Sequence, residues 1–367
     1  MGRKGENIYF RKDERWEGRY HKGRKANGRI KYGYVYGKTY EEVQKKLTPL
    51  KKNAEIMLRL YGKSIMEFHE WSGQLLEDWQ ANLKVSTYSS YHHKLKNYLW
   101  EQLGDLSLYQ LDEQNIGKAV EAWRLQGLSL SSIKSIFRVL NKTLNQAVKQ
   151  GILEKNPCTL VQLPKAMKSK VQALSRNQQK KLKKVVEADH DNRSAAVILA
   201  METGMRIGEI AALTWDEVDF EQSMIYVNHT YQRVTDNQGT KLHLGSAKTE
   251  AAQRSVPMSG TVRDILLRLK IQASEETFVF TTNGKPCEPR LLTYHFHRIR
   301  KKARLEKVHF HQLRHTFATR CLEATPDVLA VSRILGHSSI KMTLDTYGHS
   351  IQEQQVAAVQ AMTRAIA

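Results

Sequence analysis

The sequence predicts a multidomain protein: a small α+β domain, an all-α domain, and a mixed, mainly α domain with a small antiparallel sheet. Three observations lead to this fold class. At 367 residues the chain is too long for one typical core. Strings that alternate as β-strands do open the chain, and an amphipathic helical stripe follows in its middle. Helical and strand-like strings then succeed one another over the last part.

Composition narrows the function before any motif is considered. The chain has 58 Lys and Arg against 37 Asp and Glu, a formal net charge of +21, which points to a polyanionic partner, most commonly nucleic acid. Its three cysteines are far apart and form no CxxC pair, which is typical of a reducing compartment. No window of about 18 apolar residues occurs, so we expect a soluble protein of the cytoplasm without a membrane partner.

Residues 1–52 predict the small α+β domain. They carry 16 basic and 6 acidic residues, 16 − 6 = +10, with aromatic residues between them. The strings NIYFRK, RWEGRYHK and IKYGYVYG predict three strands, KANGR predicts a turn, and a short helix should begin near Thr39. The basic face of such a sheet can lie in a DNA groove, with Arg19, Lys22 and Arg24 as candidate contacts. The alternative is an ordinary α+β module with a solvated charged face.

Residues 63–160 predict the all-α domain, joined to the first by a short segment near residues 50–62. Ser86 or Thr87 can cap one helix. Ser129 to Ser132 precede another, whose apolar residues recur with helical spacing and which should end at Asn156–Pro157.

Basic residues in the middle of the chain are candidate phosphate contacts, although composition equally allows that they face water. Four lie on exposed faces of the predicted helices, and one lies in a basic linker over residues 160–172. They are Lys94, Lys96, Lys134, Arg138 and Lys168.

Residues 173–367 predict the mixed domain. Strands are expected over SMIYVNHTYQRV, QRSVPM and TFVF. Helices are expected at about 193–203, 206–213, 288–304, 311–323, 326–335 and 339–346, and in the tail.

Six side chains of this last domain form a candidate site for a single phosphodiester: Arg206, Lys248, His311, Arg314, His337 and Tyr347. A guanidinium group presents a rigid fork that matches two phosphate oxygens and stays charged at any working pH. Arg206 and Arg314 could therefore neutralise both non-bridging oxygens and the added charge of a pentacoordinate state. Taken singly, either arginine is more often a partner in a surface salt bridge.

The histidines of the set supply proton transfer. His311 and Arg314 lie three residues apart, hence on one face of a helix, where the imidazole can take and return a proton. His315 points about 100° further round that helix and is interpreted as a packing or supporting residue. His337 follows Gly336, a helix cap, and precedes Tyr347 by 347 − 337 = 10 residues. A capping or core role is the alternative for His337.

Tyr347 and Lys248 complete the chemistry. A tyrosine hydroxyl, with a free pKa near 10, needs a base or an electropositive site to attack at neutral pH. Lys248 lies in a candidate hairpin, KLHLGSAKTEAAQRSVP, from which its ammonium group can protonate a leaving oxygen. Lys241 of the same hairpin is an alternative donor, and an exposed lysine without a role is the ordinary interpretation.

These residues stand, in order, in the strings TGMRIGE, KTEAAQRSVP, HQLRH, LGH and TLDTYGH. The set resembles the catalytic residues of the tyrosine recombinases, the phage-integrase superfamily. Glu209 matches the acidic residue that the family places one helical turn after its first arginine, as a supporting group. Residues 63–160 look like the family's helical core-binding domain. Residues 1–52 resemble the three-stranded arm-binding domains in integrases of mobile elements from Gram-positive bacteria.

The resemblance implies a reaction. Tyr347 would attack a scissile phosphate, form a 3′-phosphotyrosyl link and release a 5′-hydroxyl. Arg206, Arg314 and His337 would hold the phosphate, His311 would act as base and later as acid, and Lys248 would protonate the 5′ oxygen. No cofactor, metal or ATP is expected.

The resemblance also implies partners. They are double-stranded DNA with core and arm attachment sites, a Holliday junction, a homotetramer assembled on the DNA, and accessory factors for excision or bending, all at the bacterial nucleoid. The amphipathic tail after Tyr347 would dock on a neighbouring protomer or pack on its own domain.

The expected function is thus integration and excision of a mobile element, with three alternatives. A chromosome-dimer resolvase normally lacks a basic first domain, and the LGH string, the tail and the three-domain order argue against a type IB topoisomerase. An inactive DNA-binding or architectural protein would lack part of the catalytic set, which is complete here.

Overall fold

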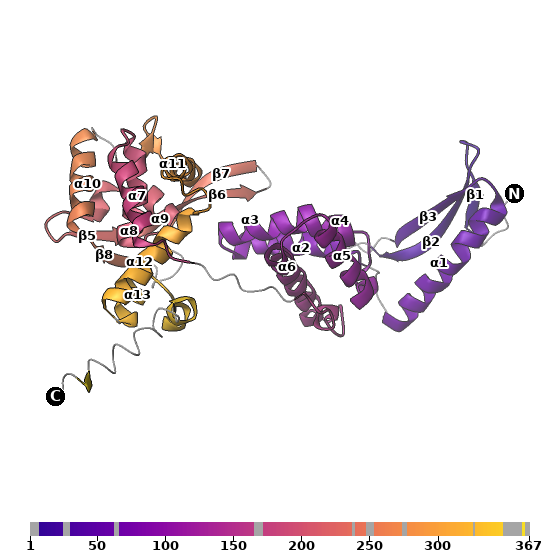
Figure 1. The fold of residues 1–367 in the computed structure, drawn as a ribbon. Coiled ribbons are helices and arrows are strands. Elements are labelled where there is room, and N and C mark those ends of the chain that lie inside the picture. Colours follow the sequence, from indigo (N-terminus) through magenta and orange to yellow (C-terminus); the bar gives the residue numbers. More distant parts are fainter. Residues whose placement is uncertain are drawn as a thin grey trace. The chain divides into compact units, whose positions relative to one another are not determined.

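The computed structural model describes residues 7–24, 30–61, 66–164, 172–236, 239–246, 253–273, 277–325, 327–347 and 362–363. The chain divides into two compact units, Met1–Met167 with Thr235–Gln238, and Lys168–Val234 with Gly239–Ala367. Figure 1 shows a small sheet with one helix, a helical region, and a mainly helical region with small sheets. The predicted fold class is confirmed. Within the described residues, no helix is long and apolar enough to cross a membrane.

The N-terminal sheet packs one face against a single helix. Its strands are antiparallel in the order β1-β2-β3, namely β1 Ile8–Phe10, β2 Trp16–Arg24 and β3 Ile30–Gly37, and α1 is Tyr40–Tyr61. Val43 and Leu47 of α1 are buried with Ile8. A Cβ on Gly18 would lie 2.7 Å from Val43 Cγ1, so the absence of a side chain there lets the helix approach β2.

Two expectations about this region meet different outcomes. The prediction of a connecting segment over residues 50–62 is wrong, because α1 continues through Pro49 as far as Tyr61. The expected turn KANGR lies outside the described residues.

The helical region has its own core. Trp123, Leu95 and Ile133 are fully buried in it, and the Trp71 indole N–H donates to the Thr143 carbonyl at 3.1 Å. Its helices are α2 Phe68–Asn82, α3 Val85–Lys94, a π-helical turn Leu95–Leu99, α4 Trp100–Leu103, α5 Glu113–Leu125 and α6 Leu130–Lys149, with 3-10 turns at Leu108–Gln110 and Pro157–Thr159.

The starts of two helices in this region test the predicted caps. Ser86 and Thr87 do not cap a helix, because α3 already begins at Val85, with Lys84 in the N-cap position. Ser129 does cap α6, its hydroxyl accepting from the Ser132 N–H at 3.2 Å.

The predicted end of α6 at Asn156–Pro157 is wrong as well. The helix stops at Lys149, and Gly151 takes a left-handed φ of 70° just beyond it. Asn156 instead caps the short turn Pro157–Thr159.

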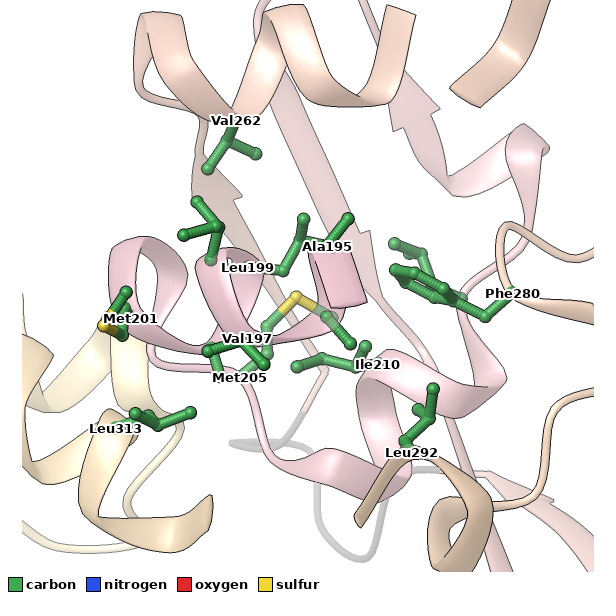
Figure 2. Close-up of a cluster of buried hydrophobic side chains, with 14 of the residues drawn as sticks. Ala195, Val197, Leu199, Met201, Met205, Ile210, Val262, Phe280, Leu292 and Leu313 are labelled. Carbon is green, nitrogen blue, oxygen red and sulfur yellow. The ribbon is translucent and has the colours of Figure 1, made fainter. Parts of the chain in front are cut away.

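The last region surrounds a buried helix. Almost every residue of α8 is buried, which is typical of a helix at the centre of a domain. Figure 2 shows Leu199 of α8 among side chains from other elements, including Ile210, Val262, Leu292 and Leu313. Its helices are α7 Arg176–Glu187, α8 Ala195–Thr203, α9 Ile207–Ala212, α10 Gly260–Gln272, α11 Pro289–Lys302, α12 Phe310–Ala324 and α13 Val328–Leu335, with 3-10 turns at Asn192–Ser194 and Trp215–Glu217 and a further helix over 340–347.

The described strands of this region form three small sheets, β4-β5-β8, β6-β7 and β9-β10. The sheet β4-β5-β8 pairs buried residues, with Ile225 opposite Val256. The strands are β4 Val218–Asp219, β5 Met224–Val227, β6 His229–Asp236, β7 Gly239–Ser246, β8 Arg254–Pro257, β9 Thr281–Thr282 and β10 Lys285–Pro286.

Three strand predictions are corrected here. SMIYVNHTYQRV breaks after Val227 into strands of two different sheets. TFVF is not a strand, and only Phe278 makes a single bridge, to Thr214. The predicted hairpin around Lys248 is also wrong, because the strands on its two sides do not pair with each other. β7 pairs with β6, whereas β8 pairs with β5 and meets the apolar residues of β5 in the core.

Candidate active site

Three arginines from three elements converge on the C-terminal end of α13. The last carbonyl groups of a helix lack partners within it and carry the negative end of its dipole. The hydrogen bonds are Arg254 Nε to the Ile334 carbonyl (2.5 Å), Arg314 Nη2 to the Leu335 carbonyl (2.6 Å) and Arg206 Nη2 to the Gly336 carbonyl (3.5 Å). The helix end therefore fixes the directions of all three guanidinium groups.

Glu209 joins two of these arginines. Its carboxylate accepts from Arg206 Nη1 at 2.7 Å and from Arg254 Nη2 at 2.8 Å, and also from the Arg206 backbone N–H. Burial would raise the pKa of Glu209, but Arg254 and Arg206 more than offset this and hold the pKa below its ordinary value. The Arg254 side chain is 5% exposed and Arg206 38%, so only Arg206 combines this anchoring with access to solvent.

Gly204 links α8 to the same site. Its carbonyl accepts from Arg314 Nη1 at 2.7 Å. Gly204 ends α8 with a left-handed φ of 67°, and a Cβ there would lie 2.5 Å from the Phe317 ring. The TGMR string is thereby explained, because only glycine allows both this turn and the close approach of α12.

The site holds more positive charge than Glu209 balances. Arg314 is buried, and this burial, together with the charge of Arg206, lowers its pKa to about 9. The pKa of His337 is lowered to about 4 by burial and by the neighbouring arginines. Binding an anion is especially favourable in a pocket that lowers the pKa values of its cations, because the anion stabilises their charged forms.

His337 is held by a buried threonine. It follows Gly336, whose left-handed φ of 64° ends α13 as the sequence predicts. The His337 backbone N–H donates to the Ser332 carbonyl at 3.1 Å, and its Nδ1 lies 2.8 Å from the Thr343 hydroxyl. The ring is thus oriented from both its backbone and its Nδ1 side.

Tyr347 contacts the site through His315, which the sequence predicts to be a packing or supporting residue. The Tyr347 hydroxyl lies 2.7 Å from His315 Nδ1. Tyr347 is only 5% exposed, and burial raises its pKa to about 12 although Arg314 opposes the shift. His311 is exposed on the same helix, and its ring meets that of His315 edge-on at 4.7 Å between centroids.

A cleft of about 620 Å³ opens beside Arg206. Its other walls come from β6, from the start of α11 and from the segment after α13. The polar residues among its lining are Arg206, Glu209, His229, Thr230, Tyr231, Gln232, Arg233, Glu288, Arg290 and Ser338.

The structure thus brings five of the six predicted site residues into one region, with Glu209 beside them. Lys248 and Lys168 lie outside the described residues, and Lys241 is exposed on β7. Lys22 and Arg24 belong to β2.

The sequence reasoning missed Arg254 and His315. Arg254 precedes the buried Val256 by two residues, so both project to the same side of β8. That period was a usable signal, because an arginine on the buried side of a strand needs a partner. The contact of His315 carried no such signal, since Tyr347 is distant in sequence.

The open face of the N-terminal sheet carries a second cluster, the arginine–tyrosine face, formed by Tyr9, Arg11, Glu17, Arg19, Tyr34 and Tyr36. The Arg19 guanidinium lies over Tyr9 and Tyr34, 5.3 and 5.6 Å from the ring centroids. Glu17 accepts from Arg11 Nη1 and Arg19 Nε, both at 2.6 Å, and Arg19 with Arg11 lowers its pKa.

The candidate phosphate contacts of the helical region differ in exposure. Lys96 and Arg138 are exposed, and Lys134 is partly buried. The Lys94 amine contacts the Ser90 hydroxyl, and burial lowers its pKa.

Comparison with known proteins places this chain in a family. Residues 172–354 match the model of the phage integrase family, and residues 67–171 match that of the phage integrase SAM-like domain. A "Tyrosine recombinase XerC-like" protein of Caldanaerobacter subterraneus subsp. tengcongensis is 27% identical, with 93% of each chain covered. The ICEBs1 integrase of Bacillus subtilis is 22% identical, with 77% of this chain and 79% of that protein covered.

Solved structures show the same fold. The Tn1549 transposon integrase, in complex with a circular intermediate DNA, superposes with a TM-score of 0.70 at 23% identity, covering 80% of this chain and 99% of that one. A lambda integrase tetramer bound to a Holliday junction gives 0.59 at 17% identity, with 91% and 96% covered. The chain therefore belongs to the phage integrase family, as a tyrosine-type site-specific recombinase.

Proposed function

We propose that this recombinase integrates and excises a mobile genetic element through a 3′-phosphotyrosyl intermediate. The observation that carries the proposal is the position of the Tyr347 hydroxyl beside a buried, positively charged pocket, in which the Glu209 carboxylate pairs with two of the three arginines. A phosphodiester is the anion that such a pocket and nucleophile would serve together.

Arg206, Arg314 and His337 hold the scissile phosphate in this proposal. Both terminal nitrogens of Arg314 donate to backbone carbonyls, and each keeps a second hydrogen for a phosphate oxygen. Arg206 reaches the cleft, and with Nδ1 of His337 held by Thr343, Nε2 is the nitrogen we assign to the phosphate. Glu209 and Arg254 keep this geometry fixed while the charge develops.

Cleavage forms the bond between the Tyr347 oxygen and phosphorus and breaks the bond to the 5′ oxygen. The sequence prediction gives the proton of the Tyr347 hydroxyl to His311, and we assign the proton for the leaving oxygen to Lys248. Rejoining by a 5′-hydroxyl reverses each step, and the phosphotyrosyl link keeps the bond energy, so the protein's own groups suffice.

The remaining domains are proposed to bind DNA. Residues 1–52 would bind arm sites through the arginine–tyrosine face, residues 63–160 would bind core sites, and residues 173–367 would catalyse. The Tn1549 integrase in complex with a circular intermediate DNA supports DNA binding, and the lambda integrase tetramer on a Holliday junction supports a tetramer. Accessory bending or excision factors complete the proposal.

Covalent trapping tests the reaction. The protein and a Tyr347→Phe variant are incubated with nicked duplexes carrying candidate attachment sites, without metal or ATP, and analysed on denaturing gels. We expect a DNA–protein adduct with Tyr347 only. An adduct of equal yield with the phenylalanine variant would contradict the proposal, and tight binding without any adduct on a functional site would favour an architectural protein.

A further inference from the structure

The Tyr347 hydroxyl has a proton acceptor in direct contact. His315 Nδ1 lies 2.7 Å from it, and the two rings are 5.6 Å apart between centroids. Burial raises the pKa of Tyr347, so the phenol keeps its proton. The pKa of His315 is lowered to about 4 by burial, His311 and Arg314, so the imidazole is neutral. In the tautomer that carries its hydrogen on Nε2, the hydroxyl donates and Nδ1 accepts, and this is the tautomer that can take the tyrosine proton.

The position of His315 in the chain ties this contact to the phosphate site. His315 follows Arg314 directly on α12, and Arg314 is fixed by the Gly204 and Leu335 carbonyls. A hydrogen bond to His315 thus places the Tyr347 oxygen relative to the same helix that carries a proposed phosphate ligand. Because Tyr347 is in the helix over 340–347, the bond joins two separate elements across the pocket.

We infer that His315 is a catalytic residue that aligns the Tyr347 hydroxyl and accepts its proton during attack, an inference that rests on the proposed phosphotyrosyl reaction. The Tyr347 O–P bond forms as the proton passes from the hydroxyl to His315 Nδ1. The P–O5′ bond breaks, and the leaving oxygen takes its proton from the proposed acid, Lys248. In rejoining, His315 returns the proton to the departing tyrosine oxygen.

This assignment moves the role of base from His311, where the sequence prediction puts it, to His315. His311 is exposed, whereas His315 is partly buried and bonded to the nucleophile. The groups that face His315 are His311 and Arg314 on α12, His337 after α13, and Tyr347. Burial, followed by the charges of His311 and Arg314, makes His315 a weak base in the free protein. A bound phosphate brings negative charge against them and strengthens the base where it is needed.

Cleavage by His315→Ala and His315→Asn variants tests the inference. The asparagine oxygen can accept the tyrosine hydrogen bond but cannot take the proton at working pH. Single-turnover cleavage is measured from pH 6 to 9 on two otherwise identical duplexes. One has the natural 5′ oxygen at the scissile bond, and the other has sulfur there, which leaves without needing a proton.

We expect both variants to cleave about 10²- to 10⁴-fold more slowly than the wild type. Their rates should rise with pH, because hydroxide must replace the lost acceptor, while the wild-type rate shows no such rise from His315. Added imidazole should restore the alanine variant, and the sulfur substrate should restore neither. A small loss that is equal at every pH, or full recovery on the sulfur substrate, would overturn the inference.

Controls separate this inference from the proposed function. His190→Ala removes an exposed histidine remote from Tyr347 in the sequence and should leave the pH profile and the imidazole response unchanged. If Tyr347→Phe still forms the adduct, the phosphotyrosyl reaction fails. If Tyr347 is required but both His315 variants match the wild type, only the role of His315 fails. Should the alanine variant misfold, the asparagine variant still gives the pH profile.

Discussion

The catalytic pocket and the arginine–tyrosine face both place one glutamate between two arginines, yet they expose those arginines very differently. Glu209 binds Arg206 and Arg254, whose side chains are 38% and 5% exposed. Glu17 binds Arg11 and Arg19, which are 42% and 48% exposed. In the pocket the arginines also donate to helix-end carbonyls, whereas on the sheet they lie over tyrosine rings.

The difference separates two uses of positive charge. Guanidinium groups that are held by fixed backbone acceptors keep one geometry, which stabilises a single transition state without reorganisation. Guanidinium groups that stack on aromatic rings at a solvated surface keep freedom to meet different phosphates, and their contributions to binding are additive and screened by salt. We therefore expect substitutions in the pocket to stop chemistry and substitutions on the sheet to weaken binding.

Removal of the whole N-terminal region should have the largest effect. Because α1 continues to Tyr61, the deletion should cover residues 1–61 rather than 1–52, which would cut the helix. Integration between full attachment sites should be lost, while cleavage of a core site persists, since the tethered second binding site disappears but the pocket does not. Recombination assays on full and core-only sites measure both activities. Equal integration by the truncated protein would refute the separate roles proposed for the N-terminal region and the catalytic pocket.

Arg314→Lys should come next, with cleavage slowed about 10²- to 10³-fold. A lysine has no planar fork, so it cannot serve the Gly204 carbonyl, the Leu335 carbonyl and a phosphate together. Adduct formation measured in a single turnover tests this. DNA affinity, measured by gel shift, should change little. If DNA affinity fell by the same factor as cleavage, Arg314 would act by binding DNA, as is expected of the sheet arginines.

Glu209→Gln should destabilise the protein by about 3 kcal/mol, because a buried Arg254 loses its counter-charge. The folded pKa of Glu209 lies below its ordinary value of 4.5. Its contribution is therefore complete above that value and disappears as the pH falls through the lower folded pKa. Denaturant unfolding from pH 7 down to 3 should show this loss in the wild type and not in the variant. Glu17→Gln is the matched comparison and should cost much less, since its arginines remain hydrated.

Arg19→Gln should have the smallest effect, a few-fold weaker binding to DNA. One lost phosphate contact should reduce the slope of log affinity against log salt by about 1. Fluorescence anisotropy over a salt series measures both values. Arg124→Gln, which removes an equal charge from an exposed site on α5, serves as the control and should leave the slope as it is.

The sequence predicts most of this molecule where the pattern is local. Strand alternation, the apolar stripe of α6 and the cap at Ser129 depend on residues close together in the chain, and the structure confirms them. The predicted bounds of helices and strands are wrong where contacts with residues far away in the sequence decide the structure. TFVF is apolar enough for a strand, but the core uses Phe280 as a packing residue and pairs only Phe278.

The candidate site shows the same limit at the level of single residues. Ordered motifs singled out Arg206, Glu209, His311, Arg314, His337 and Tyr347 without any coordinates. Motifs give residue types and order, and they carry no directions. They could not show that the end of α13 holds three arginines, since those acceptors are backbone carbonyls that any sequence supplies.

The sequence by itself determined the domain classes, the family and the set of chemical groups, because periodicity, charge and motif order are properties of the chain. Only the tertiary structure decided which histidine bonds to the nucleophile and which arginine is buried. These depend on how α12, α13 and β8 pack around α8, where contacts between residues far apart in the chain set burial, charge and hydrogen-bond direction together.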